Sequence, residues 1–376
     1  MNKITRILQA EIENRMLPGK VMLLFGARRV GKTILIKSIA EKFSGKILFL
    51  NGEDATTHVL LQDKTVANYT FLLNGVKLLI IDEAQNISDI GAKLKLIVDE
   101  LPAIYVIASG SSSFDLLNLT GEPLVGRSKT FYLFPFSQEE MLQVESGVEV
   151  FNNLEQKMIF GTYPQLLNMN PSEKQEYLTD LVNGYLLKDI LSIEGLRNSN
   201  KMSDLLKLIA FQTGNLVSYD ELGRQLGLSK NTVEKYLDLL SKVFIVYRLN
   251  AFSGNLRKEI SKSGKWYFYD NGIRNALISN FSPLSIRTDV GQLWESFVLS
   301  ERIKRKHFHL LPVNHYFWRT YDQQEVDLIE VQNQEIKAYE CKWSAKSSKA
   351  PVAFSKIYLA ASFTEINKQN FINFIT

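Results

Sequence analysis

Short apolar runs alternate with amphipathic stretches along the first third of the chain. Five of these runs have the length of a strand, and several are apolar throughout: Val21–Phe25, Lys46–Leu50, Lys77–Ile81, Ala103–Ala108 and Thr130–Phe134. Parallel strands that are buried on both faces have this composition. The alternation of such strands with amphipathic helices predicts an α/β domain built on a parallel sheet.

The pattern changes twice further along the chain. Residues 137–204 read as helical, with Leu181, Tyr185, Lys188 and Asp189 at helical spacing. The stretch Leu205–Leu249 predicts a small helical module that ends in a strand. Aromatic strands follow this module, at Trp266–Tyr269, His315–Trp318, Val326–Val331 and Ala338–Trp343.

Composition narrows the class of protein. The chain has 376 residues, 45% hydrophobic and 22% charged, as in ordinary globular proteins of more than one domain. We find neither an apolar run long enough for a transmembrane helix nor a secretory signal. Cys341 is the single cysteine, which excludes an internal disulfide and a cysteine-rich zinc site. We expect a cytoplasmic protein without a membrane partner, and the net charge of +4 permits a nucleic-acid partner without requiring one.

A phosphate-binding loop follows the first apolar run. The loop fits the pattern G-x-x-x-x-G-K-[ST] with the residues Gly26, Ala27, Arg28, Arg29, Val30, Gly31, Lys32 and Thr33. A chance glycine-rich turn is the competing interpretation, but the strand before the loop and the amphipathic helix after it are the context that the motif needs. We expect backbone N–H groups to bind ATP phosphates, Lys32 to reach the β- and γ-phosphates, and Thr33 to ligate Mg²⁺.

Two carboxylates end the third apolar run. Asp82 and Glu83 follow Leu78–Ile81, at the strand end where ligands bind in parallel sheets. We expect Asp82 to belong to the Mg²⁺ shell and Glu83 to orient or deprotonate the attacking water. A solvated acidic strand end is the alternative, and the nearby phosphate-binding loop makes it less favourable.

Further polar residues follow the next strands. Ser109 and Ser111 could touch the γ-phosphate or the water, or they could belong to a simple turn capped at Ser112 or Ser113. Arg127 precedes the fifth apolar run. An arginine at a subunit edge could reach the γ-phosphate of a neighbouring copy, and a plain surface arginine is the alternative.

The order of these motifs resembles that of a known family. The residues that carry the likeness are the two ATPase motifs, then Leu124–Arg127, Leu133–Ser137, Gly161–Pro164, Tyr267–Gly272, Leu293–Glu295 and Phe317–Arg319. The chain resembles prokaryotic AAA+-type ATPases whose C-terminal domain is uncharacterised and related to restriction endonucleases. The resemblance implies a sensor at Ser109 or Ser111 and an arginine finger at Arg127. It implies four segments: an AAA+-like ATPase core (1–136), a helical region (137–204), a winged-helix segment (205–252) and a restriction-endonuclease-like domain (253–376).

The third segment contains a helix-turn-helix pattern. Ser218 and Glu221 form a capping box before a short helix, Gly227 makes the turn, and Ser229 caps a second helix. On that second helix the outward side chains suited to DNA are Lys230, Asn231 and Lys235. A winged helix used as a spacer or as a protein-docking module is the alternative.

The C-terminal segment carries acids on neighbouring predicted strands. Glu340 and Lys342 share a face by the two-residue period, and Asp327 on the adjacent strand could complete a carboxylate pair around Mg²⁺, with Glu295 as a third acid. Such a site can activate water against a phosphodiester. A retained fold whose acids and lysine form a structural ion-pair cluster is the competing interpretation, and we favour it slightly.

The leading functional hypothesis is a Mg²⁺-dependent ATPase that couples its nucleotide state to DNA binding. Its expected cofactors are ATP and Mg²⁺, and its expected partners are DNA and further copies of the chain. The rival hypothesis is a signalling switch in which ATP controls the docking of a protein partner. A coherent basic face across the last two segments would favour DNA.

Overall fold

A five-stranded parallel sheet forms the centre of the N-terminal part. The computed structural model describes residues 4–111, 124–186, 199–253, 264–344 and 348–376. The strands are β1 (Val21–Phe25), β2 (Lys46–Asn51), β3 (Val76–Asp82), β4 (Tyr105–Gly110) and β5 (Ser128–Tyr132). Their order in the sheet is β2-β3-β4-β1-β5, and every neighbouring pair is parallel. The predicted α/β class and parallel sheet are confirmed.

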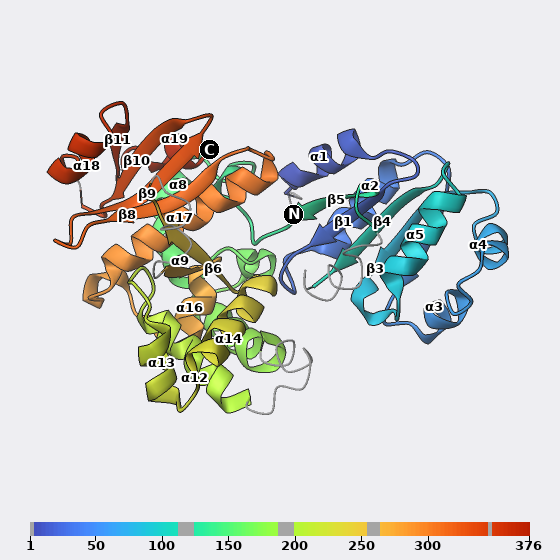
Figure 1. Cartoon of the computed structure of the whole chain (residues 1–376), viewed down its shortest axis with the longest axis horizontal. Helices are drawn as coiled ribbons and strands as arrows, with labels where there is room; N and C mark the ends of the chain where they lie inside the picture. Colours follow the sequence, from blue (N-terminus) through green and yellow to red (C-terminus); the bar gives the residue numbers. More distant parts are fainter. Residues whose placement is uncertain (1–3, 112–123, 187–198, 254–263, 345–347) are drawn as a thin grey trace.

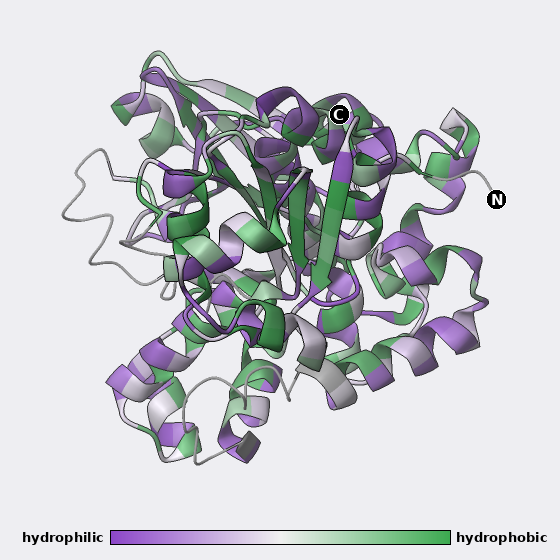
Figure 2. Cartoon of the chain, turned by 90° about the vertical axis from the view of Figure 1, so that its right-hand side faces the viewer, coloured by the Kyte–Doolittle hydropathy of each residue, from purple (hydrophilic) through white to green (hydrophobic). Residues whose placement is uncertain are grey.

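Helices flank this sheet on both faces (Figure 1). They are α1 (Ile7–Arg15), α2 (Lys32–Lys42), α3 (Ala55–Leu60), α4 (Val66–Leu72), the 3-10 turn η1 (Ala84–Asn86) and α5 (Ile90–Glu100). Each residue of β1 is buried, and so is every residue of β3 except Lys77. Figure 2 shows these strands as hydrophobic and the surrounding helices as mixed. Burial on both faces explains the continuous apolar runs in the sequence.

Short helices follow β5. They are α7 (Gln138–Met141), α8 (Gly147–Asn152), α9 (Leu154–Phe160), the 3-10 helix η2 (Pro164–Asn168), α10 (Pro171–Asp180) and the π-helix η3 (Leu181–Leu186). Complete capping boxes start α7, α8 and α10, at Ser137, Ser146 and Asn170. The predicted helical character of this segment is confirmed where the structure describes it, whereas Lys188 and Asp189 lie outside the described residues.

Three helices then precede a second sheet. They are α12 (Ser199–Phe211), α13 (Tyr219–Leu226) and α14 (Lys230–Lys242). The turn between α13 and α14 contains Gly227 in the left-handed conformation, with φ of 63°, and Ser229 accepts the Thr232 N–H at the start of α14. Glycine adopts this conformation without the steric cost that a Cβ brings. The two predicted helices and their turn are therefore present.

The second sheet joins the C-terminal part to this helical module. Its strands are β6 (Val246–Ala251), β7 (Lys265–Phe268), β8 (Asn314–Arg319), β9 (Glu325–Gln332), β10 (Glu335–Cys341) and β11 (Ser362–Ile366), in the order β11-β10-β9-β8-β6-β7. The helices around it are α16 (Asn271–Leu277), the 3-10 turn η4 (Leu284–Ile286), α17 (Val290–Phe308), α18 (Val352–Ile357) and α19 (Phe371–Ile375).

Strand β6 belongs to two pairings. Val246–Leu249 pairs antiparallel with β7, and Asn250 and Ala251 pair in parallel with β8. The hairpin after α14 and the C-terminal strands are thus parts of one sheet. The predicted division between residues 252 and 253 falls at the end of this shared strand, and the four-segment division remains a proposal.

Buried polar contacts join the two parts of the chain. Lys304 on α17 is 2% exposed, and its Nζ donates to the carbonyl oxygen of Phe136 at 3.0 Å and to Thr162 Oγ1 at 3.2 Å, while pairing with Glu301 at 2.7 Å. The ring of Phe134 stacks on that of Tyr269, with centroids 4.9 Å apart. Among the described residues, we find no helix with the length and apolarity to cross a bilayer.

Candidate active site

The phosphate-binding loop connects β1 to α2. Gly31 has φ of 98° and leads directly into α2 without a side-chain cap, so that the first N–H groups of the helix face the site. Gly26 is required for a different reason. A Cβ at that position would lie 2.1 Å from the carbonyl oxygen of Leu133 after β5, which is closer than atoms can approach. The loop therefore depends on glycine for backbone conformation at one end and for close packing at the other.

Lys32 and Thr33 occupy the first turn of α2. Lys32 is 5% exposed, and its Nζ donates to the carbonyl oxygens of Gly26 at 2.9 Å and Ala27 at 3.0 Å. The ammonium group thus spans the loop into which phosphates would fit. Thr33 Oγ1 donates to Asp82 Oδ2 at 2.6 Å, although the two residues are far apart in sequence. The structure thus brings the two residues expected to ligate Mg²⁺ together, and hydroxyl and carboxylate oxygens are ligands that this ion prefers.

The end of β3 forms a hydrogen-bonded cluster with the end of β4. Ser109, which is fully buried, donates from Oγ to Asp82 Oδ1. The Glu83 N–H lies 3.2 Å from Asp82 Oδ1 and 3.3 Å from Ser109 Oγ, and Glu83 has a left-handed φ of 51°. Gln85 Nε2 donates to Glu83 Oε2 at 2.6 Å and to Ser111 Oγ at 3.3 Å. The structure therefore brings the predicted residues Asp82, Glu83, Ser109 and Ser111 together, and Ser112 and Ser113 lie outside the described residues.

Several residues around this site were missed by sequence reasoning. The phosphate-binding loop and the two carboxylates line a cavity of about 800 Å³. Its other walls include Asn51 at the end of β2, Glu53 two residues later, and Pro164 and Gln165 at the start of η2. Asn51 and Glu53 follow a strand of the same sheet, so their position at its carboxyl edge could have been inferred. Pro164 and Gln165 come from beyond the sheet, and no local pattern places them there.

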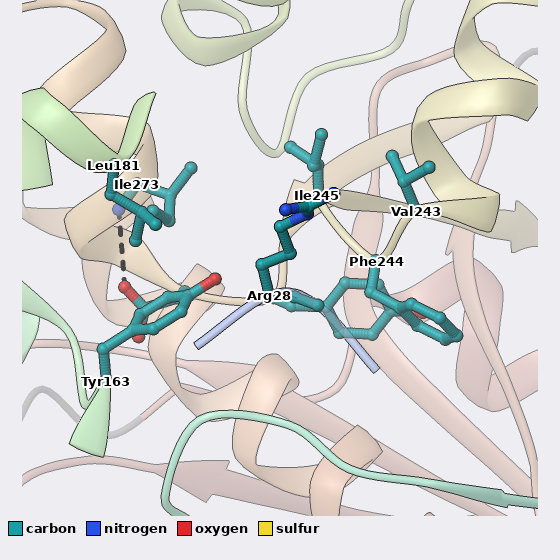
Figure 3. Close-up of a pocket in the computed structure, with 10 residues that line it drawn as sticks. Arg28, Tyr163, Leu181, Val243, Phe244, Ile245 and Ile273 are labelled. Atoms are coloured by element: carbon teal, nitrogen blue, oxygen red, sulfur yellow. Dashed lines mark hydrogen bonds between the residues drawn. The ribbon is translucent and has the colours of Figure 1, made fainter. Parts of the chain in front are cut away.

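A smaller apolar pocket lies on the other side of Arg28. Its volume is about 30 Å³, and it is lined by Ala27 and Arg28 of the loop and by Tyr163, Leu181, Val243, Phe244, Ile245, Tyr269, Asp270 and Ile273. Figure 3 shows Arg28 and Tyr163 beside the pocket, together with the residues that follow α14. The C-terminal end of α14 is thus adjacent to the phosphate-binding loop.

Arg127 lies at the opposite end of the parallel sheet. Val21 pairs with Ser128 at the start of β5, whereas the phosphate-binding loop follows Phe25. The length of this five-residue strand separates Arg127 from the loop, roughly 17 Å at about 3.3 Å per residue. Its Nε lies 2.5 Å from Asp99 Oδ1 at the protein surface, and this partner raises the pKa of Arg127. Arg127 is not placed to contact a nucleotide in its own chain, and an action on a neighbouring copy remains a proposal.

The predicted DNA-contact residues lie on the exposed side of α14. Lys230, Asn231 and Lys235 are exposed, while Val233, Leu237 and Leu240 are buried, as the helical period predicts. Lys230 Nζ lies 3.4 Å from Asp220 Oδ2 on α13. Glu234 is also exposed on α14, so the face carries both signs of charge.

The predicted C-terminal acids gather on the second sheet. Tyr339 pairs with Leu328, so that Glu340 and Asp327, one position further, face each other across β9 and β10. Glu340 Oε1 accepts from Lys342 Nζ at 2.6 Å, and Asp327 Oδ2 accepts the Cys341 N–H at 2.8 Å. Burial, together with the charges of Glu295 and Glu340, raises the pKa of Asp327 well above its usual value.

Two lysines contact this acid cluster, and only one of them was predicted. Besides Lys342, the ammonium of Lys265 at the start of β7 pairs with Glu295 and Glu325. In the sequence, Lys265 looks like part of a basic and aromatic stretch that could track nucleic acid. Arg257, Lys258 and Lys262 of that stretch lie outside the described residues, and Lys265 itself is 1% exposed. Lys265 is therefore not a surface contact residue.

Comparisons with protein families match three parts of the chain. Residues 18–142 match the model of an AAA domain. Residues 151–284 match a domain of unknown function (DUF8612), and residues 290–373 match a second domain of unknown function (DUF4143).

The chain has relatives in bacteria and archaea. An uncharacterized protein of Mycobacterium tuberculosis is 28% identical over 314 residues, which cover 82% of this chain and 67% of that protein. An uncharacterized protein of Methanocaldococcus jannaschii is 24% identical over 323 residues, covering 81% of this chain and 71% of that protein.

Two solved structures show a weak likeness. A RuvB variant of Thermotoga maritima gives a TM-score of 0.31 at 17% identity, covering 65% of this chain and 86% of that one. Drosophila ORC bound to AT-rich DNA and Cdc6 gives a TM-score of 0.24 at 14% identity, covering 72% and 88%. Scores this low carry no conclusion about activity. The family matches place a P-loop, AAA-type ATPase-like domain in the N-terminal part of the chain and a domain of unknown function in its C-terminal part.

Proposed function

We propose that the chain is a Mg²⁺-dependent ATPase whose nucleotide state controls DNA binding. The observation that carries the ATPase assignment is the contact between Thr33 and Asp82, at 2.6 Å, beneath the phosphate-binding loop. A threonine hydroxyl after the loop and an aspartate at the end of β3 serve one metal ion in this class of site. The cavity of about 800 Å³ provides room for a triphosphate beside them.

Each residue has a role that its position supports. Thr33 and Asp82 would hold Mg²⁺, which supplies charge stabilisation on the phosphates when it is bound. When a nucleotide binds, the Lys32 ammonium would exchange its hydrogen bonds to the loop carbonyl oxygens for contacts with phosphate oxygens. Glu83, held by Gln85, orients the attacking water and accepts its proton. Ser109 fixes the Asp82 carboxylate from the side opposite Thr33.

The link to DNA rests on the position of α14. This helix runs from the exposed Lys230, Asn231 and Lys235 to the turn after Lys242 that lines the small pocket beside Arg28. A helix of thirteen residues spans about 20 Å at 1.5 Å per residue. One rigid element therefore extends from the nucleotide site to a surface that can contact phosphates. The helix-turn-helix, the hairpin β6–β7 and the basic residues support a winged-helix assignment.

ATP hydrolysis is tested with three variants. Lys32→Ala should abolish tight ATP binding, and Glu83→Gln should bind ATP but lower kcat by about 100-fold or more, as loss of a general base does. Glu53→Gln is the matched control, because Glu53 is a second carboxylate in the wall of the same cavity. Hydrolysis that survives in Glu83→Gln and is lost in Glu53→Gln would reassign the base to Glu53.

DNA binding is tested by fluorescence anisotropy with ATP or ADP at two salt concentrations. Lys235→Ala should weaken binding several-fold and lower the slope of log K against log salt by about 0.9, the value for one lost phosphate contact. Lys207→Ala on α12 is the control, because Lys207 is also exposed but lies on another helix. Binding that depends on neither nucleotide nor Lys235 would contradict the coupling.

The alternative is a signalling switch that docks a protein partner. The exposed Glu234 beside Lys235 favours this alternative, because an acid on the contact face repels phosphate. Wild-type ATPase activity that DNA does not change, together with failure to bind any DNA at low salt, would favour the switch over the DNA-binding protein.

A further inference from the structure

A buried lysine lies within the C-terminal acid cluster. Lys265 is 1% exposed, and its Nζ lies 3.3 Å from Glu295 Oε1 on α17 and forms an ion pair with Glu325 on β9. It also lies 5.5 Å from the centre of the Phe317 ring on β8. The ammonium group therefore connects β7 to three other elements of the C-terminal part. Burial of a lysine this deeply is unfavourable unless acids surround it.

The carboxylate oxygens of the cluster are directed at donors of the protein. Glu295 Oε1 accepts from Tyr267 OH at 2.5 Å as well as from Lys265. Asp327 Oδ2 accepts the Cys341 N–H, and Glu340 Oε1 accepts from Lys342. Among the fully buried carboxylate oxygens of these acids, Glu340 Oε2 is the one without a hydrogen-bond partner in the part of the chain that the structure describes, and one such oxygen is too few to hold a divalent ion.

The charges of the cluster are also close to balance without a metal. The acids are Glu295, Glu325, Asp327 and Glu340, and the basic groups are Lys265, Lys342 and Arg319. Arg319 belongs to the cluster because its Nη1 lies 3.1 Å from Glu325 Oε2. Among the residues that the structure describes, no three His, Cys, Asp or Glu side chains are grouped so as to hold a metal ion. The residues present therefore do not fit the Mg²⁺ that a nuclease-like site would need.

We propose that the Lys265 ammonium occupies the position of a cation in this cluster, so that the acids tie β7, α17 and β9 together and exclude a divalent metal. The inference concerns the C-terminal part alone and does not rest on the ATPase assignment. Desolvation favours the neutral amine, but the carboxylates of Glu295, Asp327 and Glu325 outweigh it and raise the pKa of Lys265, which keeps it charged.

Removal of the ammonium should open the position to a metal. In Lys265→Met the acids lose their central positive charge at nearly constant side-chain volume, and their repulsion should lower the unfolding temperature by several degrees. Millimolar Mn²⁺ should restore much of that loss. Lys157→Met is the matched control, because Lys157 is also a buried lysine, paired with Glu145 and Gln138 in another part of the chain. It should be destabilised without rescue by Mn²⁺.

The experiment uses the full chain with Asp82→Asn, so that the ATP site contributes no metal binding. Equilibrium dialysis of this Asp82→Asn protein against Mn²⁺ should find no bound metal, because Lys265 is present. This measurement leaves every residue of the acid cluster unchanged. Thermal unfolding then compares three variants: Lys265→Met, Lys157→Met, and a double variant that combines Lys265→Met with Glu340→Gln. Mn²⁺ should not restore the unfolding temperature of the double variant. Stoichiometric Mn²⁺ bound beside native Lys265 would overturn the proposal. Equal responses of Lys265→Met and Lys157→Met to Mn²⁺ would also overturn it.

Discussion

Gly161→Ala should destabilise the protein and weaken ATP binding, because this glycine lies where two parts of the chain meet. Gly161 has φ of 72°, and a Cβ there would lie 1.9 Å from Asp270 Oδ1 and 2.3 Å from its Cγ. The Asp270 carboxylate cannot move away without cost. It is buried and accepts N–H groups from Thr162 at 2.8 Å, Gly272 at 2.9 Å and Ile273 at 3.4 Å.

Two costs add at this position. Gly161 has φ of 72° and ψ of −161°, a conformation nearly restricted to glycine, which costs a residue with a Cβ about 1–3 kcal/mol. Displacement of Asp270 loses at least one hydrogen bond to a buried charge, about 1.5–3 kcal/mol. We expect a total loss of about 2.5–6 kcal/mol for Gly161→Ala. Gly75→Ala is the matched control, because Gly75 has φ of 71° and nothing within 4 Å of its Cβ position. It should lose only the conformational part.

The assays are urea denaturation and the KM for ATP. The loop that starts at Gly161 continues to Pro164 and Gln165 in the wall of the phosphate cavity, so its displacement should raise KM several-fold in Gly161→Ala. Gly75→Ala should leave KM unchanged, because Gly75 precedes β3 and is absent from the lining of that cavity. Denaturation midpoints that agree between the two variants would refute the steric argument. A lower midpoint with an unchanged KM would refute the link between the loop and the nucleotide.

Three further predictions concern charged groups. Arg127→Ala should lower ATP turnover only at protein concentrations where copies assemble. If the activity is full and does not depend on protein concentration, Arg127 does not act as an arginine finger on a neighbouring copy. Burial raises the pKa of Glu330, but hydrogen bonds from His315 and Arg302 bring it down to about 2. The stability advantage of wild type over Glu330→Gln should therefore be complete above pH 4.5 and disappear as the pH falls toward 2. Burial lowers the pKa of His307 to about 4, so wild type should lose stability relative to His307→Phe as the pH falls from 6.5 to 4. Unfolding midpoints measured across pH test both.

The arrangement of the candidate ATP site could be predicted because its signal in the sequence is local. The loop from Gly26 to Thr33 is continuous in sequence, and Asp82 and Glu83 end an apolar strand whose neighbours in a parallel sheet follow from the pattern. Strands bring their carboxyl ends to one edge, so that separate motifs meet there. The hydrogen bond between Thr33 and Asp82 is the direct consequence.

The remaining features depend on contacts between distant segments. Pro164 and Gln165 reach the cavity beside the phosphate-binding loop from beyond the sheet, and nothing in their own neighbourhood indicates this position. Strand β11 is a five-residue strand at the edge of the second sheet with a single fully buried residue, Ile366, and its residues did not predict a strand. The basic neighbours of Lys265 in the sequence indicate a surface residue, whereas the structure buries it. Its place at the start of the otherwise apolar strand β7, with the acids Glu295 and Glu325 later in the chain, was the available signal for burial.

The contacts between the N-terminal part and α17 share one feature, which is a buried charged side chain. Lys304 and Glu301 pair with each other on α17, and each also bonds to backbone of the N-terminal part. Lys304 Nζ donates to the carbonyl oxygen of Phe136 at 3.0 Å, and Glu301 Oε2 accepts the N–H of Gln138 at 2.6 Å. Apolar surfaces can slide past each other at modest cost, because the hydrophobic effect has no direction. A buried charged group that loses its hydrogen-bond partner costs about 1.5–3 kcal/mol. These contacts therefore hold the N-terminal part and α17 in register. The proposed coupling then requires a movement that passes through an element without such contacts. Helix α14 is such an element, because its ion pairs are exposed and it leads directly into the apolar turn Val243–Ile245 beside Arg28.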